Sequence, residues 1–166
     1  TLYVPPSVIG QMTHKALELW LHIDDSRLIP LLESLTLDAG LATDEQRVEA
    51  VRRVRELIER FCAHPLREEI EHADERHHEV PYTRMNGDHS ETGYIDLLYR
   101  KENEWFVLDF KTDAIHSEEQ YKELVAKYSR QLERYASAIK QLFGQDVKLS
   151  LCFLDNNGRT HIANQS

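Results

Sequence analysis

The stretch Gly93–Asp113, GYIDLLYRKENEWFVLDFKTD, decides how this chain folds. It holds two apolar runs joined by the polar segment Lys101-Glu102-Asn103, a pattern that is typical of a β-hairpin. Asp96 interrupts the first run, Asp109 interrupts the second, and Lys111 follows two positions later. Because successive side chains of a strand point to opposite faces, we expect Asp109 and Lys111 on the same face.

Carboxylates inside apolar strands need an explanation, because an isolated buried charge is costly unless it is paired or bound to a metal. Two acids and a lysine on neighbouring strands therefore indicate a built site, most simply a centre for a divalent metal ion. The alternative is an edge hairpin whose polar face is in contact with solvent.

Length and composition limit the remaining interpretations. At 166 residues, we expect positions 1–166 to form a single domain with its own core. No apolar run approaches the roughly 20 residues of a membrane span, so a membrane is not an expected partner. The net charge of −9 argues against a free-standing module that grips nucleic acid, and it predicts weak DNA binding by this chain alone. Cys62 and Cys152 cannot form a disulfide framework or a four-cysteine metal site, and a cytoplasmic location is expected.

The first half of the chain is predicted to be mainly helical. A helix with Ser7 as its N-cap is expected over about 8–22, and 24–42 is expected to be irregular or weakly helical. The capping box Thr43-Asp-Glu-Gln46 opens a second helix, which Pro65 ends. Its expected inner face consists of Val48, Val51, Val54, Leu57, Ile58 and Phe61.

Charged side chains are dense on and after this second helix. Its arginines alternate with glutamates and predict a solvated face, with a patch facing a DNA backbone as the alternative; they are Arg47, Arg52, Arg53, Arg55 and Arg60. Residues 66–78 are rich in histidine and acids but match no zinc signature, so they are interpreted as a polar connection.

The second half is predicted to alternate strands with one long helix. The first strand begins at Glu79, and the capping box Ser117-Glu-Glu-Gln120 opens a helix that Gly144 closes. The other expected strands cover about 92–100, 104–111, 147–154 and a short segment after the turn Asn156-Asn157-Gly158. Three antiparallel strands and a helical crossover to a fourth predict an α/β (α+β) fold, with helices against a mixed central sheet.

Five short motifs, in order along these elements, resemble the PD-(D/E)xK nuclease superfamily. Within it, they are similar to the RecB/AddA-like nuclease domain of bacterial superfamily-1 (UvrD-like) helicases. The matching motifs are Gly10-x-x-x-His14, Glu79-x-Pro81, Gly93-x-Ile95-Asp96, Asp109-Phe-Lys111-Thr112 and Gln131-x-x-x-Tyr135. The resemblance implies a restriction-endonuclease-like core with a helical insertion at about 24–76.

The resemblance also implies a role for each matching residue. The expected ligands of Mg²⁺ or Mn²⁺ are His14, Asp96, Asp109 and the backbone carbonyl of Phe110. Lys111 would orient or deprotonate the attacking water and offset charge on the phosphate. Substrate-lining residues would be Gln131, Tyr135 and, less directly, Glu79. Taken alone, His14 would be a structural histidine, and Gln131 with Tyr135 would be helix packing.

As a member of this family, the chain would be the C-terminal nuclease domain of a longer bacterial helicase–nuclease. Its expected substrate is DNA, as a single-stranded end or an unwound duplex, in double-strand break repair. A helicase domain in the same chain would use ATP, since no Walker A loop occurs here, and a second helicase–nuclease subunit is a further candidate partner. Two cysteines exclude the four-cysteine iron–sulfur cluster of some relatives.

Three rival interpretations remain open at this point. The first is a DNA-binding or scaffold domain of a helicase complex whose site has lost its activity. The second is a small-molecule metal hydrolase that shares only the carboxylates, and the third is a helical interaction module, which the strands of Gly93–Asp113 disfavour.

Overall fold

The structure is a computed structural model that describes residues 2–165. It contains helices α1 (Pro6–Glu18), α2 (Leu28–Asp38), α3 (Asp44–Ala63), α4 (Pro65–Glu71) and α5 (Glu118–Phe143). Its strands are β1 (Glu75–Asn86), β2 (His89–Lys101), β3 (Glu104–Lys111), β4 (Val147–Asn156) and β5 (Arg159–Gln165). Within residues 2–165, no helix has the length and apolar character needed to cross a membrane.

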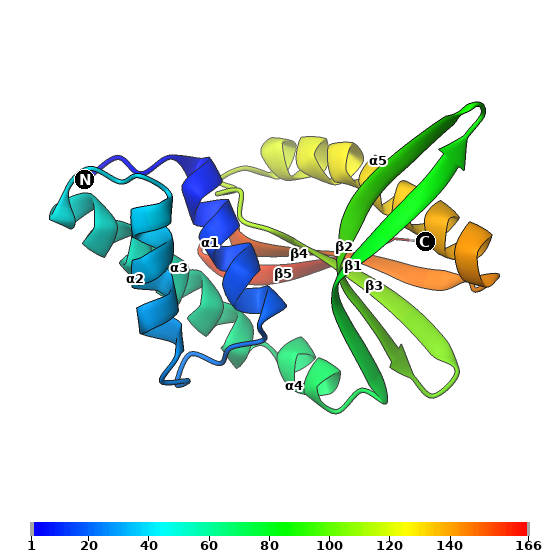
Figure 1. Cartoon of the computed structure of the whole chain (residues 1–166), viewed down its shortest axis with the longest axis horizontal. Coiled ribbons are helices and arrows are strands. Elements are labelled where there is room, and N and C mark those ends of the chain that lie inside the picture. The colour runs from blue at the N-terminus through cyan, green and yellow to red at the C-terminus, as the bar shows by residue number, and fades with distance from the viewer. Residues whose placement is uncertain (1, 166) are drawn as a thin grey trace.

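The strands form one mixed sheet in the order β1-β2-β3-β4-β5. Neighbours are antiparallel except β3 and β4, which are parallel and joined by the crossover helix α5. Figure 1 shows α5 along one side of the sheet and α1 to α3 gathered at its other side, with the β1–β2 hairpin projecting beyond the rest. This arrangement confirms the predicted mixed sheet flanked by helices.

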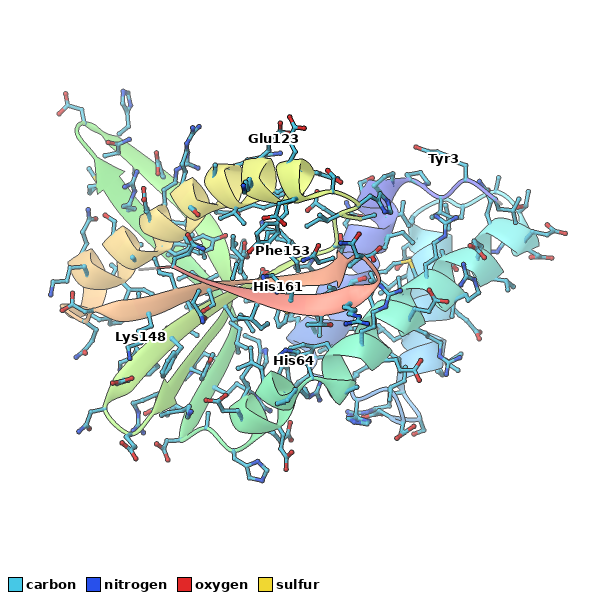
Figure 2. All side chains as sticks on the ribbon, turned by 180° about the vertical axis from the view of Figure 1, so that it is seen from behind. Tyr3, His64, Glu123, Lys148, Phe153 and His161 are labelled. Atoms are coloured by element: carbon cyan, nitrogen blue, oxygen red, sulfur yellow. The ribbon has the colours of Figure 1, made fainter. Side chains whose placement is uncertain are left out.

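Two hydrophobic cores lie on opposite faces of the sheet. One packs α1 to α4 against β2, β3 and β4, and there the Phe61 and Phe110 rings meet edge to face with centroids 5.1 Å apart. The other packs α5 against the opposite face, where Phe153 of β4 lies beneath the helix (Figure 2) and contacts Tyr121 at 5.6 Å between ring centroids. Helices therefore pack against both faces of the sheet.

Local signals set most of the helix ends. Thr43 Oγ1 accepts a hydrogen bond from Gln46 N at 3.1 Å, and Ser117 Oγ accepts one from Gln120 N at 3.1 Å, as the two capping boxes predict. Gly144 takes a left-handed φ of 67° at the end of α5, a conformation that a residue with a Cβ adopts only at a cost.

Other expected boundaries are wrong. Helix α1 begins at Pro6 rather than after Ser7, because proline fixes a helical φ and its missing N–H costs nothing in the first turn. It ends at Glu18, and Trp20 then has a φ of 55°. By the same proline rule Pro65 begins α4, two residues after α3 ends at Ala63. Val48 is 70% exposed instead of buried, since Ala50 takes the inner position.

Two segments, 24–42 expected to be irregular or weakly helical and 66–78 interpreted as a polar connection, are more regular than expected. Residues 28–38 form α2, and 66–78 divide between α4 and the start of β1 at Glu75. His64 Nδ1 caps α4 by accepting from Leu66 N at 3.1 Å, and His77 Nε2 lies 3.1 Å from Glu75 Oε2. Local hydrogen bonds and sheet pairing thus account for histidines that carried no recognisable motif.

The feature that matters most for function is a fork between β2 and β3. These strands pair only from Leu97 opposite Leu108 to Lys101 opposite Glu104. Beyond Leu97, β2 stays paired with β1, whereas β3 beyond Leu108 stays paired with β4. Asp96 and Asp109 are the first residues past the last β2–β3 pair, so each enters the opening between the diverging strands.

Candidate active site

The two carboxylates at the fork lie against one another. The Phe110 N–H, released from the β2–β3 ladder, donates to Asp96 Oδ2 at 2.9 Å. Asp109 is 2% exposed, and its carboxyl group contacts that of Asp96. Strand divergence therefore leaves a backbone donor and two acids together where a continuous ladder would have buried apolar side chains.

His14 reaches the same point from α1. Its Nδ1 lies 2.8 Å from the Gly10 carbonyl, and its Nε2 lies 2.9 Å from the Phe110 carbonyl and 3.2 Å from Asp96 Oδ2. Carbonyl and carboxylate oxygens only accept, so both ring nitrogens face acceptors, and the nearby Asp96 carboxylate favours the protonated imidazole. A Cβ built on Gly10 would lie 3.3 Å from Thr112 Oγ1, so the glycine lets α1 approach the end of β3.

Lys111 is held from several directions on the α5 side of the sheet. Its Nζ lies 2.8 Å from Asp109 Oδ2, which confirms that alternation places the two side chains on one face. The same Nζ donates to Gln131 Oε1 at 2.8 Å and lies 4.0 Å from the centroid of the Tyr128 ring. The ammonium group is thus fixed by an ion pair, an amide and a cation–π contact.

Tyr135 is placed one helical turn beyond Gln131 on α5. It is 3% exposed, and its ring meets that of Tyr82 edge to face with centroids 5.4 Å apart. Tyr82 lies opposite Gly93 on β2, and a Cβ at Gly93 would come within 2.8 Å of the Tyr82 ring. The glycine of the third motif thus leaves room for an aromatic contact behind the site.

Glu79 lies at a local break in the β1–β2 ladder, directly opposite Asp96 in the register. The β1–β2 register passes from His78 opposite Leu97 to Val80 opposite Ile95 without a shift, so one residue on each strand, Glu79 and Asp96, is left unpaired, and Glu79 has a φ of 47°. Its side chain lines a small cavity with His14, Asp96 and Phe110. This break in the ladder therefore places Glu79 next to the fork, and its role there stays a prediction.

The charges of the site interact strongly. Burial, reinforced by the Asp96 carboxylate, raises the pKa of Asp109 to about 8. Burial also opposes a charge on Asp96, but hydrogen bonds from His14 and the Phe110 N–H hold its pKa below the usual range. Burial alone would lower the pKa of His14, yet Asp96 raises it to about 9. Burial and the nearby Asp96 raise the pKa of Glu79.

The donor set fits a divalent cation, although residues 2–165 contain no ready-made cluster of three or more His, Cys, Asp and Glu ligands. Carboxylate and carbonyl oxygens with one imidazole suit Mg²⁺ or Mn²⁺. Donors about 2.1 Å from an octahedral ion stand about 3 Å apart, close to the 2.9 and 3.2 Å that separate His14 Nε2 from Phe110 O and Asp96 Oδ2. The Gly10 carbonyl holds the other ring nitrogen, as in metal-bound histidines. Asp109 Oδ2 is buried, and its close partner is the Lys111 ammonium at 2.8 Å.

Tyr128 and Asp113 lie near the site but were not among the predicted site residues. Tyr128 contacts Lys111 with its ring and donates to Asp113 Oδ2 at 2.9 Å. The spacing of Tyr128, Gln131 and Tyr135, three and four residues apart, already places them on one flank of a helix. That spacing is the sequence signal from which Tyr128 could have been predicted as a neighbour of the site.

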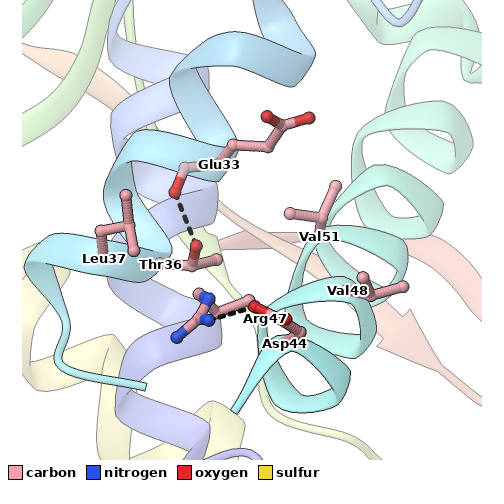
Figure 3. Close-up of a pocket in the computed structure, with 7 residues that line it drawn as sticks. All are labelled: Glu33, Thr36, Leu37, Asp44, Arg47, Val48 and Val51. Carbon is pink, nitrogen blue, oxygen red and sulfur yellow. Dashed lines mark hydrogen bonds and ion pairs between the residues drawn. The ribbon is translucent and has the colours of Figure 1, made fainter. Parts of the chain in front are cut away.

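A separate cavity of about 440 Å³ lies between α2 and α3 (Figure 3). Leu37 and Val48 line it and are largely exposed, while Thr36 and Arg47 supply polar edges. Residues predicted for the active site take no part in its lining.

Comparison with known proteins agrees with this geometry. A family model described as the PD-(D/E)XK nuclease superfamily matches residues 2–165. The chain is 32% identical over 56% of its length to an ATP-dependent helicase/nuclease subunit from Staphylococcus carnosus, covering 9% of that protein. It is 30% identical over 83% of its length to the corresponding protein of Limosilactobacillus fermentum, covering 12% of it.

The fold comparison is independent of these sequence matches. The match with the structure of a candidate exonuclease from Eubacterium rectale covers the whole of this chain and 60% of the exonuclease chain. The TM-score is 0.63 and the sequence identity is 9%. At that identity the likeness concerns the fold. The fork geometry, the family match over residues 2–165 and the shared fold lead to one conclusion: the chain belongs to the PD-(D/E)XK nuclease superfamily.

Proposed function

We propose that this chain is the nuclease domain of a helicase–nuclease and that it hydrolyses DNA phosphodiester bonds with a divalent metal ion. The observation that carries the proposal is the convergence of His14, Asp96, Asp109 and Lys111 at the fork between β2 and β3. Because the chain spans about a tenth of its curated relatives' length (9% and 12%), a helicase domain in the same polypeptide belongs to the proposal.

The residues divide the work by their chemistry. His14, Asp96, Asp109 and the Phe110 carbonyl would hold Mg²⁺ or Mn²⁺, which lowers the pKa of bound water and polarises a phosphoryl oxygen. Lys111, positioned by Gln131, orients the attacking water and offsets negative charge on the phosphate. Fixed charges of this kind are the main protein contribution to phosphoryl transfer, because they need no rearrangement during the reaction.

Tyr135 and Gln131 border the reacting group from α5, and Glu79 borders it from β1. The proposed substrate is a single-stranded DNA end that a helicase delivers during repair of a double-strand break. ATP is used only by that helicase domain, and a second helicase–nuclease subunit is a further proposed partner.

The test is cleavage of a fluorescent single-stranded oligonucleotide with Mg²⁺ or Mn²⁺. Asp109→Asn and Lys111→Gln should each lower the rate by about 100-fold or more. Asp146→Asn and Lys148→Gln are matched controls, because their side chains are 92% and 66% exposed. Wild-type rates in both site variants would refute the proposal. Binding of Mn²⁺ and DNA without cleavage would support instead a scaffold domain.

A further inference from the structure

The candidate site opens into a cleft of about 680 Å³. His14 and Lys111 lie in its wall, and Thr112 and Tyr128 continue that wall at the end of β3 and on α5. The opposite wall belongs to α3, which is part of the helical segment before the sheet. A strand placed at the fork can therefore continue along α3 without leaving the cleft.

The α3 wall carries three arginines: Arg52, Arg53 and Arg60. Together with Lys111 they outnumber the acids lining the cleft, which are Glu56, Asp113 and Asp155, although the whole chain has a net charge of −9. A local excess of cations on an acidic protein marks the place where a polyanion is tolerated.

Contacts within the protein hold these guanidinium groups in place. Arg53 donates to the Leu2 carbonyl at 2.7 Å, and Arg60 donates to the Leu154 carbonyl at 3.4 Å and pairs with Asp155 at 3.2 Å. Arg52 pairs with Glu49 and Glu56, yet its side chain remains 53% exposed. Each guanidinium has five N–H donors, so all three keep donors that these bonds do not use.

We propose that this cleft binds the phosphates of the nucleic-acid strand that enters the site, with Arg52, Arg53 and Arg60 as contacts. The inference rests on the proposed nuclease function and adds a binding track to it. Eight residues of helix between Arg52 and Arg60 span about 12 Å, which matches roughly three phosphates of a stacked strand. Contacts to phosphate carry no base information, so binding is independent of sequence.

The test is fluorescence anisotropy of a labelled oligothymidine without divalent metal, between 50 and 200 mM salt. Arg52→Gln should weaken binding about fivefold and lower the slope of log affinity against log salt by about 0.7. Arg55→Gln is the matched control, because it removes the same charge from an exposed position of α3 outside the cleft. Equal effects of the two substitutions, or none, would overturn the proposal.

Glu56→Gln is expected to increase the affinity for the oligothymidine, a result that unfolding of the variant cannot produce. Glu56 lines the cleft and pairs with Arg52, so its neutralisation should tighten binding about fivefold. Unchanged or weaker binding would also count against the cleft.

Cleavage separates this proposal from the nuclease function. If the protein cuts DNA but Arg52→Gln leaves KM unchanged, the cleft assignment fails and the nuclease function stands. If the Arg52 and Glu56 effects on binding appear without cleavage, the cleft stands and the nuclease function fails.

Discussion

Asp109→Asn is expected to make the metal-free protein more stable while removing its activity. The folded protein holds the pKa of Asp109 at about 8, because burial and the Asp96 carboxylate oppose its charge, whereas the unfolded chain ionises near 3.8. Between these values the unfolded state binds fewer protons, so stability falls by up to about 1.4 kcal/mol per pH unit as the pH rises. The cost is absent below pH 3.8 and complete above pH 8.

At pH 7 this amounts to at most about 4 kcal/mol, and asparagine, which cannot ionise, removes it. The neutral amide keeps the shape of the side chain and can donate to Asp96, so we expect a gain of about 2–4 kcal/mol. The assay is urea unfolding in EDTA from pH 5.5 to 7.5, with Asp146→Asn as control, because that side chain is 92% exposed. A destabilised Asp109→Asn variant, or a gain that does not grow with pH, would refute the reasoning.

Three further predictions concern the framework of the site. Ser117→Ala should lower the unfolding free energy by about 1 kcal/mol, because the N-cap hydrogen bond of α5 is lost. Ser34→Ala within α2 is the control and should be neutral. Equal changes in the two variants would show that the Ser117 cap does not stabilise α5. Burial lowers the pKa of His78 to about 4, so stability falls as pH drops from about 6.5 towards 4. Because solvent screens this partly exposed side chain, His78→Gln should remove about 1 kcal/mol of that loss at pH 5, and identical pH profiles in thermal melts would contradict this. Gly10→Ala should change stability by less than about 1 kcal/mol, since the gain in helix propensity offsets the crowding against Thr112, but it should slow cleavage by up to about tenfold. Adding Thr112→Ala to this variant should restore the rate. Full activity of Gly10→Ala alone would show that the close approach of α1 is unimportant.

The sequence was most informative where local chemistry decides the structure. The capping boxes at Thr43 and Ser117 involve neighbouring residues only, and Gly144 needs only its own backbone conformation, so all three could be predicted. Strand alternation likewise predicts Asp109 beside Lys111, because the period of two is a property of the backbone.

Features that depend on distant segments could not be predicted from the residues alone. Nothing in the sequence shows that β2 and β3 separate after Leu97, because the separation depends on which other strand each one pairs with. The same holds for Val48, whose side of α3 is chosen by the packing of α1 and α2 rather than by its own character. Only the resemblance of the motifs linked His14 to the acids, since the histidine is structurally ambiguous by itself.

The hydrogen bond between His14 Nε2 and the Phe110 carbonyl joins residues 96 positions apart. It joins α1 to the end of β3, whose parallel pairing with β4 is connected by the long α5 crossover. Contacts across such long loops form late, because chain entropy is lost before they contribute stability. During refolding, secondary structure should therefore recover before cleavage does, and the recovery of activity reports the last step of assembly.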